Sequence, residues 1–191
     1  MHFTKGLLLK MALIIVILAV TISIYSIGEK RPYPQHPQYV GSLLKPNSGQ
    51  TQEAKEKIIR QNYVDWVNKY VKASTNTSGG YYIYMGGDYI TTSEAMGYGM
   101  MTFPLMAGAN LSDLSNASGV KDAKIYFDGL VKFHQAHLRT TTSKLITWAV
   151  NTSEGNVSKE TATDGDLDMA YGLILAHEQW GSTGTYNYKF L

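Results

Sequence analysis

The chain has 191 residues, of which 44% are hydrophobic and 17% are charged, and its formal net charge is +2. These values are typical of an ordinary globular protein with one core, and they exclude the basic surface that a nucleic-acid-binding protein presents. The sequence has no cysteine, which excludes disulfide bonds as a source of stability.

The N-terminal segment has the pattern of an export signal. Lys5 and Lys10 precede the apolar run "MALIIVILAV", and apolar positions continue as far as Ile27. Ser26 and Gly28 form only a weak cleavage site, so a retained membrane span over residues 11–27 stays open as an alternative. We therefore predict that residues 1–28 are a signal peptide or an N-terminal anchor of a secreted protein. We expect membrane contact only through residues 11–27, if the leader is retained.

Residues 29–52 are predicted to form a linker or a strap over the surface of the domain. This stretch carries four of the five prolines and has no steady hydrophobic period. It separates the leader from the folded part, which we place at residues 53–191.

Four segments of the folded part have apolar residues at helical spacing. They cover about residues 53–72, 94–107, 120–138 and 166–180. Two short pieces favour strands, "YYIYM" over residues 81–85 and "KLITWAV" over residues 144–150, each before a helix. Paired helices with long polar loops predict an all-α fold.

Acidic residues stand at the predicted starts of the second and fourth helices. Thr91 with Glu94, and Thr163 with Asp166, have the spacing of a capping box, in which the acid satisfies free backbone N–H groups. For Asp166 we prefer this structural role, since an N-cap contributes about 0.5 to 2 kcal/mol.

A metal site is disfavoured by the spacing of the ligands. Asp164, Asp166 and Asp168 alternate as in a calcium loop, but the sixth and twelfth positions hold Met169 and Leu175 instead of glycine and glutamate. His134 and His137 lie three residues apart without a third ligand nearby, and we interpret them as solvated residues of a helix face. We expect neither a metal nor another cofactor.

Glu94 and Asp164 then remain as two carboxylates at helix starts, each with glycines close by. Gly97, Gly99 and Gly165 allow another backbone or a ligand to approach the acids. A pair of carboxylates that faces one cleft is typical of sugar hydrolysis. A general acid must keep its proton near neutral pH, which a helix N-terminus opposes, so we expect Glu94 to be buried against Tyr98 or Met96, close to Asp164.

Two long motifs carry a family resemblance. "SEAMGYGMM" (residues 93–101) and "ATDGDLDMAYGLILAHEQWGS" (residues 162–182) resemble the two signature motifs of glycoside hydrolase family 8. "YFDGLVKFHQAH" (residues 126–137) and "LITWAV" (residues 145–150) also resemble that family, so the similarity spans about residues 81–182.

The resemblance implies an (α/α)6 barrel that hydrolyses β-1,4-linked polysaccharide of the glucan type with inversion. Cellulose and mixed-linkage β-glucan are the expected substrates, with chitosan as an alternative. Glu94 stands at the position of the general acid, and Asp164 at that of the carboxylate that holds the distorted sugar ring. Trp148 matches a tryptophan that stacks on a sugar. We assign Tyr98 to substrate binding, although helical spacing alone favours a core position.

The resemblance also places the catalytic base downstream of the second motif. An (α/α)6 barrel has twelve helices, whereas four are predicted here, so we expect residues 53–191 to be the N-terminal part of a barrel that lacks its base and is inactive alone. The alternative function is a membrane-anchored remnant that binds carbohydrate without cleaving it.

Overall fold

The computed structural model describes residues 28–35 and 49–191. Apart from Gly28, the predicted leader lies outside the described residues, as does the larger part of the predicted strap. Within the described ranges, no helix combines the length and the apolar character that crossing a membrane requires.

Helices dominate the described residues, which confirms the all-α class. In chain order the elements are α2 (Gln52–Tyr70), β1 (Val71–Ala73), β2 (Tyr81–Ile83), β3 (Tyr89–Thr92), α3 (Ser93–Met106), α4 (Ala123–Ala136), β4 (Ala149–Asn151), α5 (Thr163–Trp180) and the 3-10 turn η1 (Tyr188–Phe190). The four α-helices correspond to the four predicted segments, with ends that differ by at most three residues.

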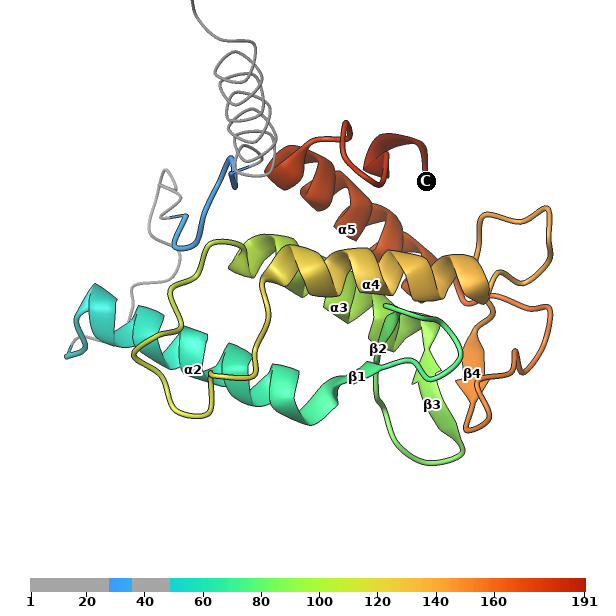
Figure 1. Ribbon diagram of the computed structural model, residues 1–191, viewed down its shortest axis with the longest axis horizontal. Helices are drawn as coiled ribbons and strands as arrows, with labels where there is room; N and C mark the ends of the chain where they lie inside the picture. Colours follow the sequence, from blue (N-terminus) through green and yellow to red (C-terminus); the bar gives the residue numbers. More distant parts are fainter. Residues whose placement is uncertain (1–27, 36–48) are drawn as a thin grey trace, which may run out of the picture.

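Helices α3, α4 and α5 form the centre of the molecule. Figure 1 shows that α3 and α5 run in the same direction, whereas α4 returns in the opposite direction across them. Helix α2 packs through the rings of Tyr63 and Trp66 against Phe103 of α3 and leads into β1 (Figure 1). Each of the two parallel helices is therefore packed against an antiparallel one, which agrees with the paired helices that the sequence predicts.

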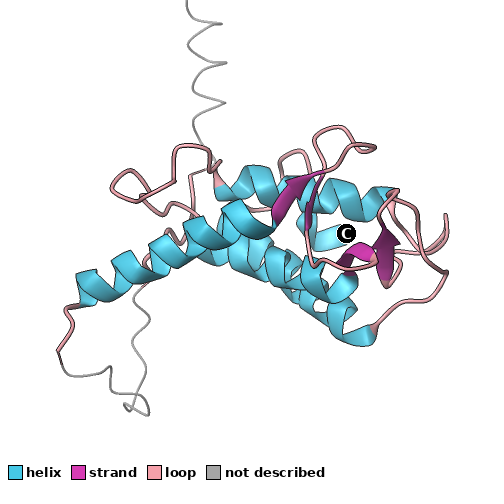
Figure 2. Ribbon diagram, turned by 90° about the horizontal axis from the view of Figure 1, so that it is seen from below, coloured by secondary structure: helices cyan, strands magenta, loops and turns pink. Residues whose placement is uncertain are grey.

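The short strands form two antiparallel pairs, β1 with β2, which follow each other in the chain, and β3 with β4, which α3 and α4 separate. Figure 2 shows the strands beside the helices as minor elements of the fold. The strand predictions were partly wrong. The first predicted piece is a strand only over residues 81–83, and β3, which precedes α3 directly, was missed. The second piece is a strand only from Ala149, where it pairs with Thr92 of β3.

Both predicted capping boxes are wrong in register. The N-cap of α3 is Thr92, whose hydroxyl accepts a hydrogen bond from the Ala95 N–H at 3.3 Å. Helix α5 begins at Thr163 after Ala162, whose methyl side chain cannot accept a capping hydrogen bond. Asp166 therefore lies inside the first turn, where its own N–H donates to the Ala162 carbonyl, so it is not the partner of an N-cap threonine.

Large apolar side chains from α3, α4 and α5 fill the core. Phe103, Phe127 and Phe133 are fully buried, and the ring of Phe127 lies 5.4 Å from that of Trp180. The interpretation of both histidines of α4 as solvated residues is wrong. His137 is buried and its Nδ1 bonds to the side chain of Asn156 at 2.9 Å, while burial lowers the pKa of His134 to about 4.

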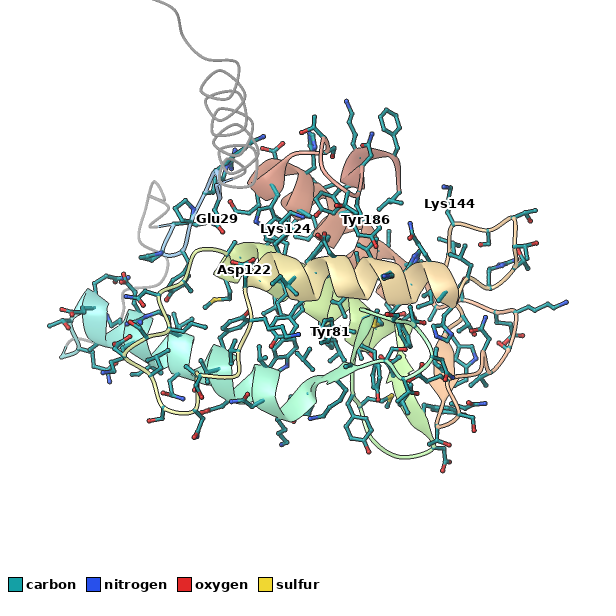
Figure 3. All side chains as sticks on the ribbon, in the orientation of Figure 1. Glu29, Tyr81, Asp122, Lys124, Lys144 and Tyr186 are labelled. Carbon is teal, nitrogen blue, oxygen red and sulfur yellow. The ribbon has the colours of Figure 1, made fainter. Side chains whose placement is uncertain are left out.

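Helix α4 has contacts on two sides. Figure 3 shows Lys124 and Tyr186 on the side of α4 that faces the C-terminal segment, and Tyr81 on the opposite side. Lys124 donates to Asp128 of the same helix at 2.6 Å and to the Tyr188 hydroxyl at 2.9 Å, which ties η1 to α4. On the other side, the ring of Tyr81 packs edge-on against that of Tyr126 at 5.1 Å.

Residues 28–35 lie against the ends of α3 and α5. The Lys30 N–H donates to the Gln179 carbonyl at 3.0 Å, and the Tyr33 N–H donates to the Ala107 carbonyl at 2.8 Å. The buried side chain of Gln179 accepts from the Arg31 N–H and donates to the Arg31 and Pro104 carbonyls. This part of the predicted strap thus joins α3 to α5 at the end remote from Glu94.

Candidate active site

Strand β3 and helix α3 position Glu94. The strand ends at Thr92, the helix begins at Ser93, and Glu94 is the second helical residue. The Ser93 N–H donates to the Trp148 carbonyl at 2.9 Å, and this hydrogen bond holds the residue that precedes β4 beside the start of α3. The partly buried ring of Trp148 packs edge-on against Tyr89 at 5.0 Å. Glu94, the predicted general acid, and Trp148, the predicted sugar-stacking residue, therefore lie on neighbouring backbone segments.

Asp164 is the second residue of α5, the same position that Glu94 occupies in α3. Its neighbour Gly165 brings the two helix starts together. A Cβ atom on Gly165 would lie 2.5 Å from the Ser93 carbonyl carbon and 2.6 Å from the Glu94 nitrogen. Only glycine permits this approach, and it places two carboxylates at the adjoining starts of parallel helices.

Gly97 extends the close contact one turn further. A Cβ atom there would lie 2.6 Å from the Cβ of Asp168 on α5. This matches the expectation that glycines near the acids admit another backbone. Gly99 instead faces Ile83 and Leu130, so it serves the core rather than the approach to Glu94.

The side chain of Tyr98 bonds to Glu94 and lies near Asp164 and Asp168. Its hydroxyl donates a hydrogen bond of 2.6 Å to Oε1 of Glu94. This hydrogen bond, followed by the negative charges of Glu94, Asp168 and Asp164, raises the pKa of Tyr98. The phenol is thus close enough to all three carboxylates to respond to their charge. Half of the Tyr98 side chain is exposed, so the core position that helical spacing favoured is wrong.

A groove of about 420 Å³ opens beside Glu94 and Tyr98. Aromatic rings form much of its wall, and its lining includes Trp66, Tyr70, Tyr84, Met85 and Thr92. Trp148 and Asp164 do not line this groove. Sequence reasoning did not select Trp66 and Tyr70 as site residues, because no local signal shows that β2 and α3 would leave their helix face partly open.

The expected burial of Glu94 needs correction. Glu94 is exposed, so the described residues do not provide the burial that we expected around it. The desolvated carboxyl is instead Asp166. Burial is the largest cause that raises its pKa, the charge of Asp164 adds to this, and a hydrogen bond with Thr161 opposes it.

The described residues contain no group of three or more His, Asp or Glu side chains placed to hold a metal ion. Asp164 accepts a hydrogen bond from the neighbouring Gly165 N–H at 2.8 Å, while Asp166 is partly buried. The three alternating aspartates all lie in α5, where residues two positions apart point in different directions around the helix. They therefore do not converge as the aspartates of a calcium loop do.

Parallel helices that present two carboxylates and aromatic rings at one end define the class of helical-barrel glycosidases. The chain belongs to the glycosyl hydrolases family 8, because the model of that family matches residues 70–190. The structural relatives are (α/α)6 barrels, and the four described helices agree with an incomplete barrel of this kind.

Named relatives agree with this membership. The chain is 39% identical over 159 residues to a beta-glucanase of Niallia circulans, and 38% identical over 169 residues to an endoglucanase of Bacillus sp. (strain KSM-330). These matches cover 83% and 84% of the chain but only 36% and 34% of the relatives. The chain thus spans about a third of the length of these relatives.

A solved structure shows the same arrangement. The apo structure of a beta-1,3-1,4-glucanase from Paenibacillus sp. X4 matches with a TM-score of 0.70 and 40% sequence identity. The match covers 83% of this chain and 39% of that chain.

Proposed function

We propose that this chain is the N-terminal part of the catalytic domain of a secreted, endo-acting β-glucanase. The enzyme cleaves β-1,4-linked glucan-type polysaccharide with inversion. The observation that carries the proposal is the contact of Gly165 with Ser93 and Glu94, which puts Glu94 and Asp164 at adjoining helix starts. Secretion is proposed from the N-terminal leader pattern.

In this proposal Glu94 is the general acid. It donates a proton to the glycosidic oxygen while a water molecule attacks the opposite face of the sugar. Asp164 holds the distorted ring in the central subsite, and Trp148 stacks on a neighbouring sugar. The exposed half of the Tyr98 ring adds to the substrate-binding surface, next to the aromatic groove.

The general base is proposed to come from a part of the enzyme outside this chain. In inverting enzymes the base lies about 6.5 to 9.5 Å from the acid, with room for a water molecule. Asp164 has another role in the proposal, and no Asp or Glu follows Glu178 in the sequence. We therefore propose that the chain alone is inactive and that its helices need the remainder of the barrel.

Mixed-linkage β-glucan and cellulose are the proposed substrates. The relatives named above are a beta-glucanase, an endoglucanase and a beta-1,3-1,4-glucanase. Chitosan is the less favoured substrate, since a cationic polymer calls for an excess of acids along the cleft. Past the leader, the chain has equal numbers of basic and acidic residues.

A hybrid enzyme tests the proposal. In this hybrid the present chain replaces the matching segment of the Niallia circulans beta-glucanase, and reducing ends are measured on mixed-linkage β-glucan, carboxymethyl cellulose and chitosan. We expect hydrolysis of the glucans, and its abolition by Glu94→Gln.

The chain offers a closely matched control for that substitution. "TQEA" at the start of α2 repeats the pattern of "TSEA" at the start of α3, and Glu53, like Glu94, is the second helical residue after a threonine N-cap. Glu53→Gln changes a helix start in the same way but should leave hydrolysis intact. Equal activity of the Glu94→Gln hybrid and its parent would show that Glu94 is not the acid. Binding without turnover in every hybrid would favour the carbohydrate-binding remnant.

A further inference from the structure

The carboxylate of Glu94 has a defined hydrogen-bond donor. Tyr98 lies one helical turn further along α3, and its hydroxyl donates to Oε1 of Glu94 at 2.6 Å. In the described part of the chain, no other side chain or backbone group donates to this carboxylate. The second oxygen, Oε2, accepts no hydrogen bond from the described residues and is left for the substrate.

The surroundings of Tyr98 keep its hydroxyl protonated. The hydrogen bond to Glu94 and the charges of Glu94, Asp168 and Asp164 raise the pKa of the phenol, so at neutral pH the hydroxyl is a donor and not a base. The backbone carbonyl of Tyr98 accepts a hydrogen bond from the Thr102 hydroxyl at 2.7 Å, within the same helix.

We propose that Tyr98 is a positioning residue that holds Oε1 of Glu94 and stabilises the carboxylate as it forms during glycosidic cleavage. This inference rests on the proposed role of Glu94 as the general acid. It gives the Tyr98 hydroxyl a function beyond contact with substrate.

The chemical step shows where this hydrogen bond matters. The proton of Glu94 passes from Oε2 to the glycosidic oxygen, and the electron pair of the broken carbon–oxygen bond goes to that oxygen. Water forms the new bond at the anomeric carbon and loses its proton to the carboxylate base of the enzyme. Glu94 becomes negative during this step, and a hydrogen bond to a charged acceptor is about twice as strong as a neutral one. The contribution of Tyr98 therefore increases in the transition state.

Tyr98→Phe in the hybrid enzyme tests the proposal, because it removes the hydroxyl and keeps the ring. We expect kcat on mixed-linkage β-glucan to fall roughly tenfold with little change in KM. A 2,4-dinitrophenyl β-cellotrioside has a leaving group that departs without a proton, so its hydrolysis should be unchanged by the substitution.

Tyr82→Phe is the control for loss of a tyrosine hydroxyl. Tyr82 packs against Phe133 in the core, and its neighbour Ile83 on the opposite face of β2 lines the groove. We expect this variant to behave as the parent on both substrates.

A second measurement tests the hydrogen bond without catalysis. The ¹³Cζ resonance of Tyr98 is followed against pH in the hybrid enzyme, and Glu94→Gln should lower the pKa of Tyr98 toward the ordinary tyrosine value. An unchanged titration would overturn the proposal.

The kinetic outcomes separate the inference from the proposed function. Unchanged kinetics of Tyr98→Phe, or equal losses on both substrates, would overturn the positioning role even where Glu94→Gln still abolishes hydrolysis. Full activity of the Glu94→Gln hybrid would overturn the proposed function and this inference together.

Discussion

Replacing Gly165 with alanine should separate the two halves of the candidate site. The new Cβ would lie 2.5 Å from the Ser93 carbonyl carbon and 2.6 Å from the Glu94 nitrogen, which are backbone atoms that cannot rotate away. Overpacking of this kind costs about 1 to 3 kcal/mol, and the rigid neighbours favour the upper end. Alanine regains about 1 kcal/mol through its helix propensity, so we expect a net loss of about 2 kcal/mol.

The same substitution should reduce activity by more than its effect on stability explains. Relief of the overlap moves α3 away from α5, and a displacement of about 1 Å at a catalytic group can lower the rate about 100-fold. Urea unfolding of the hybrid enzyme, followed by circular dichroism, gives the free energy of unfolding, and hydrolysis of β-glucan by the same samples gives kcat.

Gly119 supplies the control for this prediction. A Cβ atom on Gly119 meets nothing within 4 Å, so Gly119→Ala should change stability by less than about 0.5 kcal/mol and leave kcat intact. If Gly165→Ala keeps both the stability and the kcat of the parent, the helix contact does not assemble the site, and the reasoning is refuted.

Three further predictions concern groups away from this contact. Burial raises the pKa of Asp166, so the folded state loses stability as the pH rises through that pKa. Asp166→Asn should therefore raise the urea midpoint at pH 7, and this gain should shrink as the pH falls below that pKa and the carboxyl becomes protonated. Burial lowers the pKa of His134 from 6.5 to about 4, so stability should fall as the pH falls through this window, and His134→Gln should flatten that dependence in the same assay. The buried side chain of Gln179 bonds to the backbone of Arg31 and Pro104; Gln179→Ala should cost about 1 to 3 kcal/mol, whereas Glu178→Gln, which loses only an exposed ion pair with Arg31, should cost less than about 1 kcal/mol.

Helical periodicity was sufficient to predict where α3 lies, because its apolar positions and its polar start agree. It failed at the start of α5, where Thr163 has the composition of an N-cap and Ala162 does not. Tertiary contact explains the difference. Gly165 packs on Ser93 as a helical residue, so the helix must begin before it, and the packing overrides the local capping preference.

The missed parts of the site depend on partners that are distant in the sequence. Strand β3 has only four residues and exists because Thr91 and Thr92 pair with Val150 and Ala149 of β4, which no local pattern reveals. The groove beside Glu94 likewise needs Trp66 of α2 and Tyr84 of the β2–β3 segment to meet α3. By contrast, Glu94 and Asp164 could be selected from the sequence alone, because acids at helix starts flanked by glycines form a local pattern.

The parallel packing of α3 and α5 gives these two acids a structural role as well as the proposed chemical one. Parallel helices place their N-termini side by side, and the partial positive charges of the two ends repel each other. Glu94 and Asp164, each the second residue of its helix, place a carboxyl group at both ends, and an acid at such a position contributes about 0.3 to 1 kcal/mol when it is ionised. The fold therefore favours acidic residues at these positions whether or not a substrate is bound. For this reason Glu53→Gln, at an equivalent but isolated helix start, is the comparison that separates a loss of helix stability from a loss of the proton donor.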